Sequence, residues 1–240
     1  MEKIINYENL RYFTYSNDKL CSGEIKGIVI SFFGLGNTSM FWEDTEEGIM
    51  FAKENIILLV PYNNPWAWMN RQSIDYTDEL VDVIINKYSL PDNIPIVSSG
   101  GSMGGLASLV YTRYAKRTPV ACVSNCPVCD LPYHYTERPD LPRTLYSALA
   151  NEEGTLADAL ERYSPLHLAP SMPDVDYYIF HCTADKAVNK EKHSDLFVEA
   201  MKKSHKLTYN IVPDRGHCDL TPEMWELYNK YRISAVTERK

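Results

Sequence analysis

Short apolar runs recur along the chain and alternate with amphipathic stretches. The runs lie at 27–33, 56–62, 94–99, 119–124, 177–183 and 207–213. Continuous runs of this kind are typical of strands that are buried on both faces of a parallel sheet. Residues 9–16 instead alternate between apolar and polar side chains, which predicts an antiparallel strand at the edge of that sheet.

The stretches between these runs have the periodicity of helices that cover a core with one face. Apolar residues recur at helical spacing within 73–88, 102–115 and 190–203. A further helix should follow Thr221, which is a good N-cap residue, because Pro222 fits the first turn. The alternation of strands and helices predicts an α/β fold with a doubly wound, mostly parallel sheet and helices on both faces.

One long segment, 131–173, interrupts this rhythm. It is rich in proline, contains no good strand, and has one plausible short helix near 154–163. A connection this long inside a compact domain is usually functional. We therefore expect a single domain over residues 1–240, in which 131–173 is a small lid-like insertion over one end of the sheet.

Charge and composition exclude several classes of partner. The 240 residues include 24 basic and 32 acidic side chains, a net charge of −8, which argues against nucleic acid or an anionic membrane as partner. No run approaches the about 18 apolar residues of a membrane span. The first residues contain no apolar signal region, so we expect a cytoplasmic protein with reduced cysteines and no cofactor or metal.

The chemistry begins where one apolar run meets a helix. Gly100-Gly101-Ser102-Met103-Gly104 fits the pattern G-x-S-x-G, in which a sharp strand-to-helix turn exposes a serine hydroxyl. Small residues are needed on either side because the backbone nearly touches itself there. The Met103 N–H would lie at the helix N-terminus, where it can stabilise negative charge on a substrate oxygen. Ser102 is therefore the candidate nucleophile.

A serine nucleophile needs a base, and the base needs an acid. His217 follows an apolar run and precedes the helix after Thr221, so it is the candidate base. Asp185 follows the preceding run and is the candidate acid, with Asp214 and Asp219 as rivals. Of the other histidines, His181 lies in an apolar run, and we expect it to be buried. His193 and His205 flank the 190–203 helix and should face solvent.

Other loops can reach the same edge of the sheet. Leu35, in the glycine-rich turn after 27–33, is the candidate second oxyanion donor through its N–H. Aromatic and apolar side chains from two loops are candidates for the substrate pocket. These residues are Trp66, Trp68, Met69, Tyr133, His134 and Tyr135.

The segments "FFGLGN", "GGSMGG", "HCTADKAV" and "DRGHCDL" together resemble the α/β-hydrolase superfamily over roughly 27–231. Within it, "YSPLHLA" and "HCTADKAV" resemble the prolyl-oligopeptidase-like and acyl-peptidase-like catalytic domains and related small esterases. The resemblance implies the same roles for Ser102, Asp185, His217, Met103 and Leu35. In one departure, Phe33 stands where the superfamily often has histidine.

The sequence thus favours a serine hydrolase that cleaves a small carboxylic ester, as carboxylesterases do, through an acyl-enzyme. A peptidase or acyl-aminoacyl hydrolase with a short peptide substrate is the alternative. A remote alternative comes from Cys122, Cys126 and Cys129, whose C-x3-C-x2-C spacing matches the iron–sulfur ligands of radical S-adenosylmethionine enzymes. A hydrolase-shaped protein that only binds its ligand is the other remote alternative.

Overall fold

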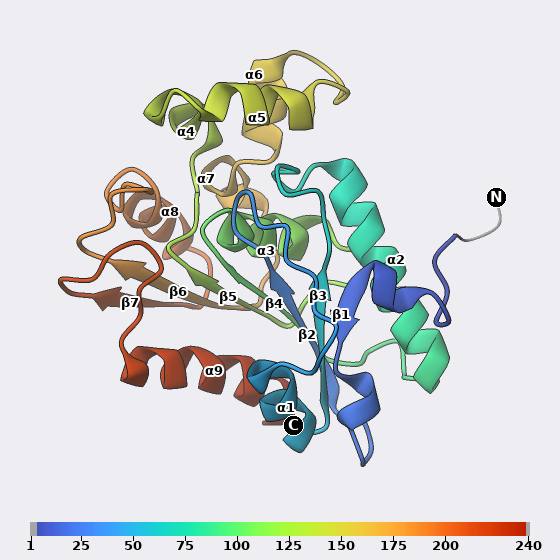
Figure 1. Ribbon diagram of the computed structural model, residues 1–240. Coiled ribbons are helices and arrows are strands. Elements are labelled where there is room, and N and C mark those ends of the chain that lie inside the picture. Colours follow the sequence, from blue (N-terminus) through green and yellow to red (C-terminus); the bar gives the residue numbers. More distant parts are fainter. Residues whose placement is uncertain (1–3, 239–240) are drawn as a thin grey trace.

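The computed structural model describes residues 4–238 and contains a seven-stranded sheet in the order β1-β3-β2-β4-β5-β6-β7. Every neighbouring pair is parallel except β1 and β3, so the predicted α/β fold class is confirmed. Figure 1 shows the twist of this sheet through the centre of the molecule. The strands are β1 Thr14–Ser16, β2 Gly27–Phe32, β3 Ile56–Pro61, β4 Ile96–Gly101, β5 Ala121–Asn125, β6 Asp176–Cys182 and β7 Leu207–Val212.

Helices cover both faces of the sheet. The helices α2 (Arg71–Tyr88), α3 (Met103–Tyr114) and α8 (Ser194–Met201) lie on one face, and α1 (Glu46–Lys53) and α9 (Pro222–Thr237) lie on the other (Figure 1). Side chains cap several of these helices: Asn70, Thr45 and Thr221 each accept a hydrogen bond from the third following N–H. The sequence analysis predicted each of these helices except α1.

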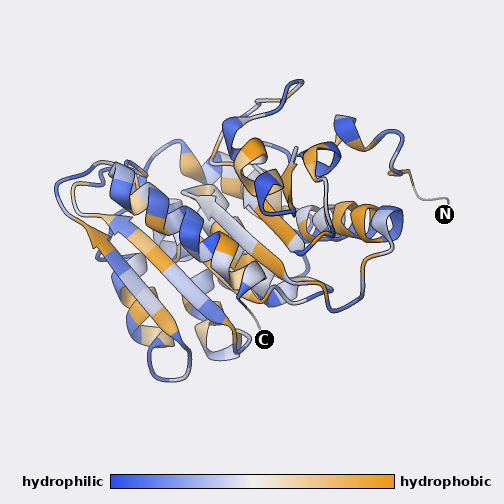
Figure 2. Cartoon of the chain, turned by 90° about the horizontal axis from the view of Figure 1, so that it is seen from below, coloured by the Kyte–Doolittle hydropathy of each residue, from blue (hydrophilic) through white to orange (hydrophobic). Residues whose placement is uncertain are grey.

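The strands pack their alternate side chains into two separate cores. Ile28 and Ile30 of β2 pack with α2 and α3, whereas Val29 packs with α1 and α9. Both kinds of side chain are fully buried, which explains why β2 reads as a continuous apolar run. Figure 2 shows hydrophobic residues along the strands and hydrophilic ones on the outer sides of the helices.

The segment between β5 and β6 is helical rather than mostly irregular. It forms α4 (Leu131–Glu137), α5 (Leu141–Leu149), α6 (Leu156–Arg162) and α7 (Pro165–Leu168), and Figure 1 places α4, α5 and α6 beyond α3, above the sheet. The expectation of one short helix was therefore wrong. Three of its six prolines lie in the first turns of α4, α5 and α7, where a missing N–H costs nothing and the fixed φ favours a helix.

The predicted edge strand is correct in position and direction but shorter than expected. Only Thr14–Ser16 pairs with β3, and Leu10–Tyr12 forms a turn of 3₁₀ helix. Within residues 4–238, none of the helices has the length and apolar character that crossing a bilayer requires.

Candidate active site

Ser102 lies in a strained turn between β4 and α3. Its φ of 60° and ψ of −125° are unfavourable for a residue with a side chain. The turn is tight enough that a Cβ at Gly100 would overlap the carbonyl of Gly104, and a Cβ at Gly104 would overlap the carbonyl of Phe32. Glycine is therefore required at both positions, and the close approach holds Ser102 clear of the sheet.

Ser102 opens into a cavity of about 480 Å³ at the carboxyl edge of the sheet. His217 lines the same cavity, so the fold brings the candidate nucleophile and the candidate base together. The other lining residues come from the ends of β2 and β4, from α4, and from the segments that follow β3, β6 and β7. They are Phe32, Phe33, Gly34, Leu35, Trp68, Gly101, His134, Arg138, Ala187, Val188 and Cys218.

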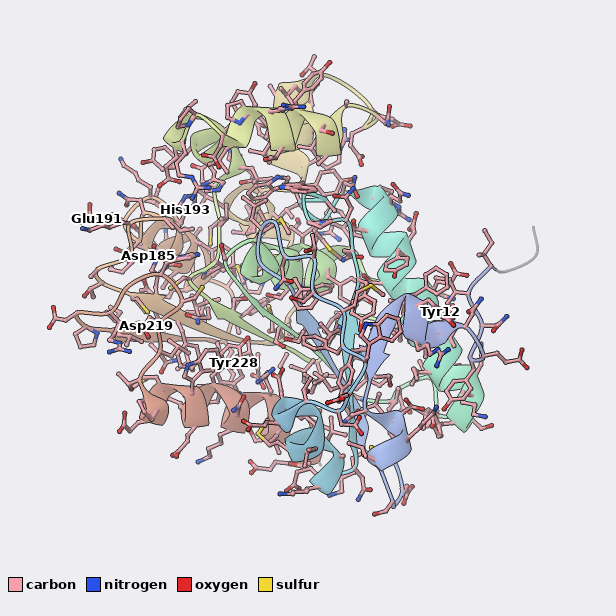
Figure 3. The ribbon with its side chains drawn as sticks, viewed as in Figure 1. Tyr12, Asp185, Glu191, His193, Asp219 and Tyr228 are labelled. Carbon is pink, nitrogen blue, oxygen red and sulfur yellow. The ribbon has the colours of Figure 1, made fainter. Side chains whose placement is uncertain are left out.

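His217 is paired with Asp185. The His217 Nδ1–H donates to Asp185 Oδ2 over 2.7 Å, and the Asp185 side chain is only 1% exposed. Figure 3 shows Asp185 and Asp219 on different segments of the chain, which follow β6 and β7. Asp219 is bound to Arg215 instead, and Asp214 is exposed, so neither rival is the partner seen for the histidine.

The carboxylate of Asp185 is held from both sides. Its Oδ1 accepts the N–H groups of Ala187 and Val188 at 2.8 and 3.0 Å, and His181 Nε2 lies 3.3 Å from Oδ2. Burial would raise the pKa of Asp185, but hydrogen bonds from His181, His217 and the Val188 N–H hold it well below its usual range. A charged, oriented acid is what a triad requires. His181 is fully buried, as predicted.

The environment of His217 favours its protonated form. Burial lowers its pKa, but the hydrogen bond and charge of Asp185, together with the Cys126 side chain, raise it to about 9. Among residues 4–238, no Ser102–His217 hydrogen bond is formed, although both groups face one cavity. Catalytic hydrogen bonds often tighten only when substrate is bound.

The two candidate oxyanion donors belong to segments that lie beside Ser102. Met103 is the first residue of α3, and Gly34 lies close enough to Ser102 that an added Cβ would be 3.8 Å from its Cβ. In the turn that contains Leu35, the Gly36 N–H donates to Pro65 and the Asn37 N–H to Gly34. Within the described part of the chain, the Leu35 and Met103 N–H groups have no such backbone acceptor, so both can serve a substrate oxygen.

Only part of the predicted substrate pocket lines the Ser102 cavity. Trp68 and His134 do so, and their rings meet edge to face at 5.4 Å. Met69 is instead buried in the core at 2% exposure. Trp66 lines a separate cavity of about 860 Å³. Tyr12, which also lines that cavity, lies on the far side of the molecule from Asp185 (Figure 3).

Tyr133 and Tyr135 also lie away from the cavity. Tyr133 packs against His193 with ring centroids 5.5 Å apart, and Tyr135 packs against the core. Both errors have one cause: successive residues of a helix point about 100° apart, so only His134 of this triplet faces Ser102. Helical spacing also identifies Arg138, four residues after His134, as a cavity residue that the sequence analysis missed.

A buried network ties α4 to the segment before α8. Glu137 Oε2 accepts from His134 Nδ1 at 2.6 Å and from His193 Nε2 at 3.1 Å. The other nitrogen of His193 accepts the N–H groups of Cys129 and Asp130. His193 is therefore fully buried, and the expectation that it faces solvent was wrong. Sequence spacing could not reveal this, because its partners lie 56 to 64 residues earlier in the chain.

The three cysteines with iron–sulfur spacing do not converge. Cys122 and Cys129 belong to the core on the α3 side of the sheet, whereas Cys126 belongs to the core on the α9 side. Strand alternation would place Cys122 and Cys126 on one face, but β5 ends at Asn125 and Cys126 has a φ of 44°, so the chain turns there and the Cys126 side chain enters the other core. These three thiols cannot bind one iron cluster together, so the remote alternative was wrong.

Comparison with known proteins agrees with this arrangement. The model of the prolyl oligopeptidase family, peptidase group S9, matches residues 66–235. The chain belongs to the prolyl oligopeptidase family. The resemblance to this family that the sequence indicated is therefore confirmed. A search of the curated proteins gave no match.

Solved structures show the same fold at low sequence identity. The chain is similar to the acylaminoacyl peptidase of Pyrococcus horikoshii, with a TM-score of 0.73 and 12% identity over 91% of this chain. It covers 38% of that peptidase, so it spans well under half of that relative's length. It is also similar to an S-formylglutathione hydrolase from Agrobacterium tumefaciens, with a TM-score of 0.71, 17% identity, and coverage of 89% of this chain and 85% of that one.

Proposed function

We propose that this member of the prolyl oligopeptidase family cleaves the amide bond of a short peptide or an N-acylated amino acid. The observation that carries the proposal is the meeting of Ser102 with the His217–Asp185 pair in one roofed cavity. The family to which the chain belongs supports amide cleavage ahead of the small-ester reaction that the sequence first favoured.

In this proposal the chemistry follows the acyl-enzyme route. His217 Nε2 takes the proton of the Ser102 hydroxyl, whose oxygen attacks the substrate carbonyl. The N–H groups of Leu35 and Met103 stabilise the negative oxygen that forms. His217 then gives its proton to the leaving amine, and water repeats the sequence on the acyl-enzyme. Asp185 stabilises the positive charge of His217 throughout.

The cavity supports a short substrate. Its volume of about 480 Å³ lies within the usual range of small-molecule sites. Phe32, Phe33 and Trp68 give it an apolar wall, and His134 and Arg138 of the insertion add polar groups. We propose that α4 acts as the roof of the site, and that the guanidinium of Arg138 favours a substrate with a carbonyl or carboxylate at that end.

Cleavage of a small ester or thioester is the second candidate. It is favoured by the similarity in fold and length to the S-formylglutathione hydrolase, of which this chain covers 85%. An ester has a better leaving group than an amide, and the same triad and oxyanion donors would serve it.

A comparison of purified substrates separates the two candidates. We expect N-acyl-aminoacyl p-nitroanilides to be cleaved with a kcat/KM that depends strongly on the acyl and side-chain groups. p-Nitrophenyl acetate and butyrate, in contrast, should be cleaved with little discrimination. Turnover of both esters without measurable cleavage of any anilide would contradict the peptidase proposal and favour the esterase. Ser102→Ala is the control for contaminating hydrolases.

A further inference from the structure

Two thiols lie close to the imidazole ring of His217. Cys218 Sγ lies 3.8 Å from His217 Nε2. Cys126 Sγ completes the group, since the ligand atoms of Cys126, His217 and Cys218 all lie within 4.8 Å of one another. The hydrolytic mechanism makes no use of either thiol. Two sulfur atoms and one imidazole nitrogen are, however, a common donor set for zinc.

The histidine is already oriented for metal binding. Its Nδ1–H is donated to Asp185, so Nε2 is the nitrogen that can bind a metal, once a protonated His217 has lost its Nε2 proton. A carboxylate that holds the other nitrogen of a ligating histidine is the usual second partner in zinc sites. In a tetrahedral site with Zn–S of about 2.3 Å and Zn–N of about 2.0 Å, sulfur and nitrogen are about 3.6 Å apart, close to the distance seen here.

Both cysteines are held in place by the backbone. Cys126 and Cys218 have φ angles of 44° and 56°, a left-handed conformation that costs a residue with a side chain free energy. Cys126 Sγ accepts the N–H groups of Cys182 and Cys218, each at 3.4 Å, which fixes the position of the sulfur. Cys218 lines the Ser102 cavity, so a cation can enter from that side.

We propose that Cys126, His217 and Cys218 bind a thiophilic divalent cation, with Zn²⁺ as the best fit, and that this cation blocks the hydrolase. Binding would release to solvent the two thiol protons and, where His217 is protonated, its Nε2 proton, and it would leave one coordination position for water. The metal would occupy Nε2, so His217 could no longer accept the proton of Ser102. The bound cation would inhibit the enzyme rather than take part in catalysis. This proposal does not depend on whether the proposed substrate class is correct.

Cobalt provides a test that does not depend on hydrolysis. Reduced, metal-free protein titrated with Co²⁺ should show a thiolate-to-cobalt charge-transfer band that saturates at one ion per chain. The band should be lost in Cys218→Ser and in Cys126→Ser. It should persist in Cys21→Ser, which is the matched control because Cys21 is the other partly exposed cysteine and lies outside the cavity.

Zinc should also protect Ser102 from a fluorophosphonate probe. We expect one equivalent of Zn²⁺ to suppress labelling of the wild type. Cys218→Ser should need about 10- to 100-fold more zinc, the range by which even indirect partners of a metal ligand change affinity. A cobalt band that survives in Cys218→Ser and Cys126→Ser, or no band in the wild type, would overturn the site. A band without loss of labelling would overturn the inhibitory role.

Because Cys126 is buried, its variant could fail to fold. Thermal melting of each variant checks this, and Cys218→Ser, at a partly exposed position, decides the question by itself if Cys126→Ser is unfolded.

Discussion

Asp185 is distinguished from its rivals by the hydrogen bonds that both of its oxygens accept. Asp185→Asn should reduce kcat by about 10⁴-fold, because the amide can present N–H to His217 and impose the wrong tautomer. Asp219→Asn, which removes only a surface pair with Arg215, should stay within a few-fold of wild type. Steady-state kinetics on both proteins check this. The reverse order of effects would show that the acid was assigned wrongly.

The raised pKa of His217 has a direct kinetic consequence. The base must be neutral to accept a proton, and a group with a pKa of about 9 is protonated below that pH. kcat/KM should therefore rise by about tenfold per pH unit below the pKa and level off near pH 9. A pH–rate profile of the purified enzyme tests this, and a rate that is constant from pH 6 to about 9 would contradict a histidine base.

Sequence patterns were most informative where the chemistry depends on neighbouring residues. The turn around Ser102 is encoded locally by Gly100 and Gly104, and His217 could be found because it follows a strand. Tyr133 and His193 could not be placed, because helix rotation and contacts with distant segments decide where their side chains point.

The turn between β4 and α3 depends on space as well as on backbone conformation. Gly104→Ala should destabilise the protein by about 1–3 kcal/mol or more, since its Cβ would overlap the rigid backbone of Phe32. Gly216→Ala is the control, because an added Cβ there meets no atom within 4 Å and should change stability by less than about 0.5 kcal/mol. Thermal or urea unfolding measures both. Equal effects would contradict the close packing of the turn.

Helix α4 is held over the site through Glu137. Burial would raise the pKa of this carboxyl, but hydrogen bonds from His134 and His193 keep it well below its usual range. Glu137→Gln loses the negative charge, and if its one oxygen keeps both histidine bonds its NH₂ group must face the Asn189 N–H that Oε1 now accepts, so the helix should loosen. We expect KM to rise several-fold with a smaller change in kcat, whereas Glu153→Gln, on the exposed part of the insertion, should change neither. An unchanged KM in Glu137→Gln would show that α4 does not shape the site.

Elements with a continuous apolar run or a helical period were predicted close to their observed positions. The insertion was not, because a proline-rich segment usually indicates irregular structure, whereas three of its prolines lie in the first turns of helices. Helix α1 was also missed. Its eight residues have only a narrow buried side, formed by Gly48, Phe51 and Ala52, which gives a weak periodic signal.

The whole molecule assembles its site from segments that are distant in sequence. Ser102, Asp185 and His217 each follow a different strand, and because these strands are parallel their carboxyl ends meet at one edge. This rule made the position of the candidate site predictable once the strands were known. The size of the cavity was not predictable, because it depends on how the insertion packs over that edge.

The central claim is that Ser102 is a nucleophile activated by His217, and covalent labelling tests it most directly. A fluorophosphonate probe should label the wild-type protein on Ser102, with the modified residue located by peptide mass spectrometry. Ser102→Ala should not be labelled, and His217→Ala should be labelled far more slowly while melting at a similar temperature. Labelling of Ser102→Ala at the wild-type rate, or of another residue in the wild type, would contradict the claim.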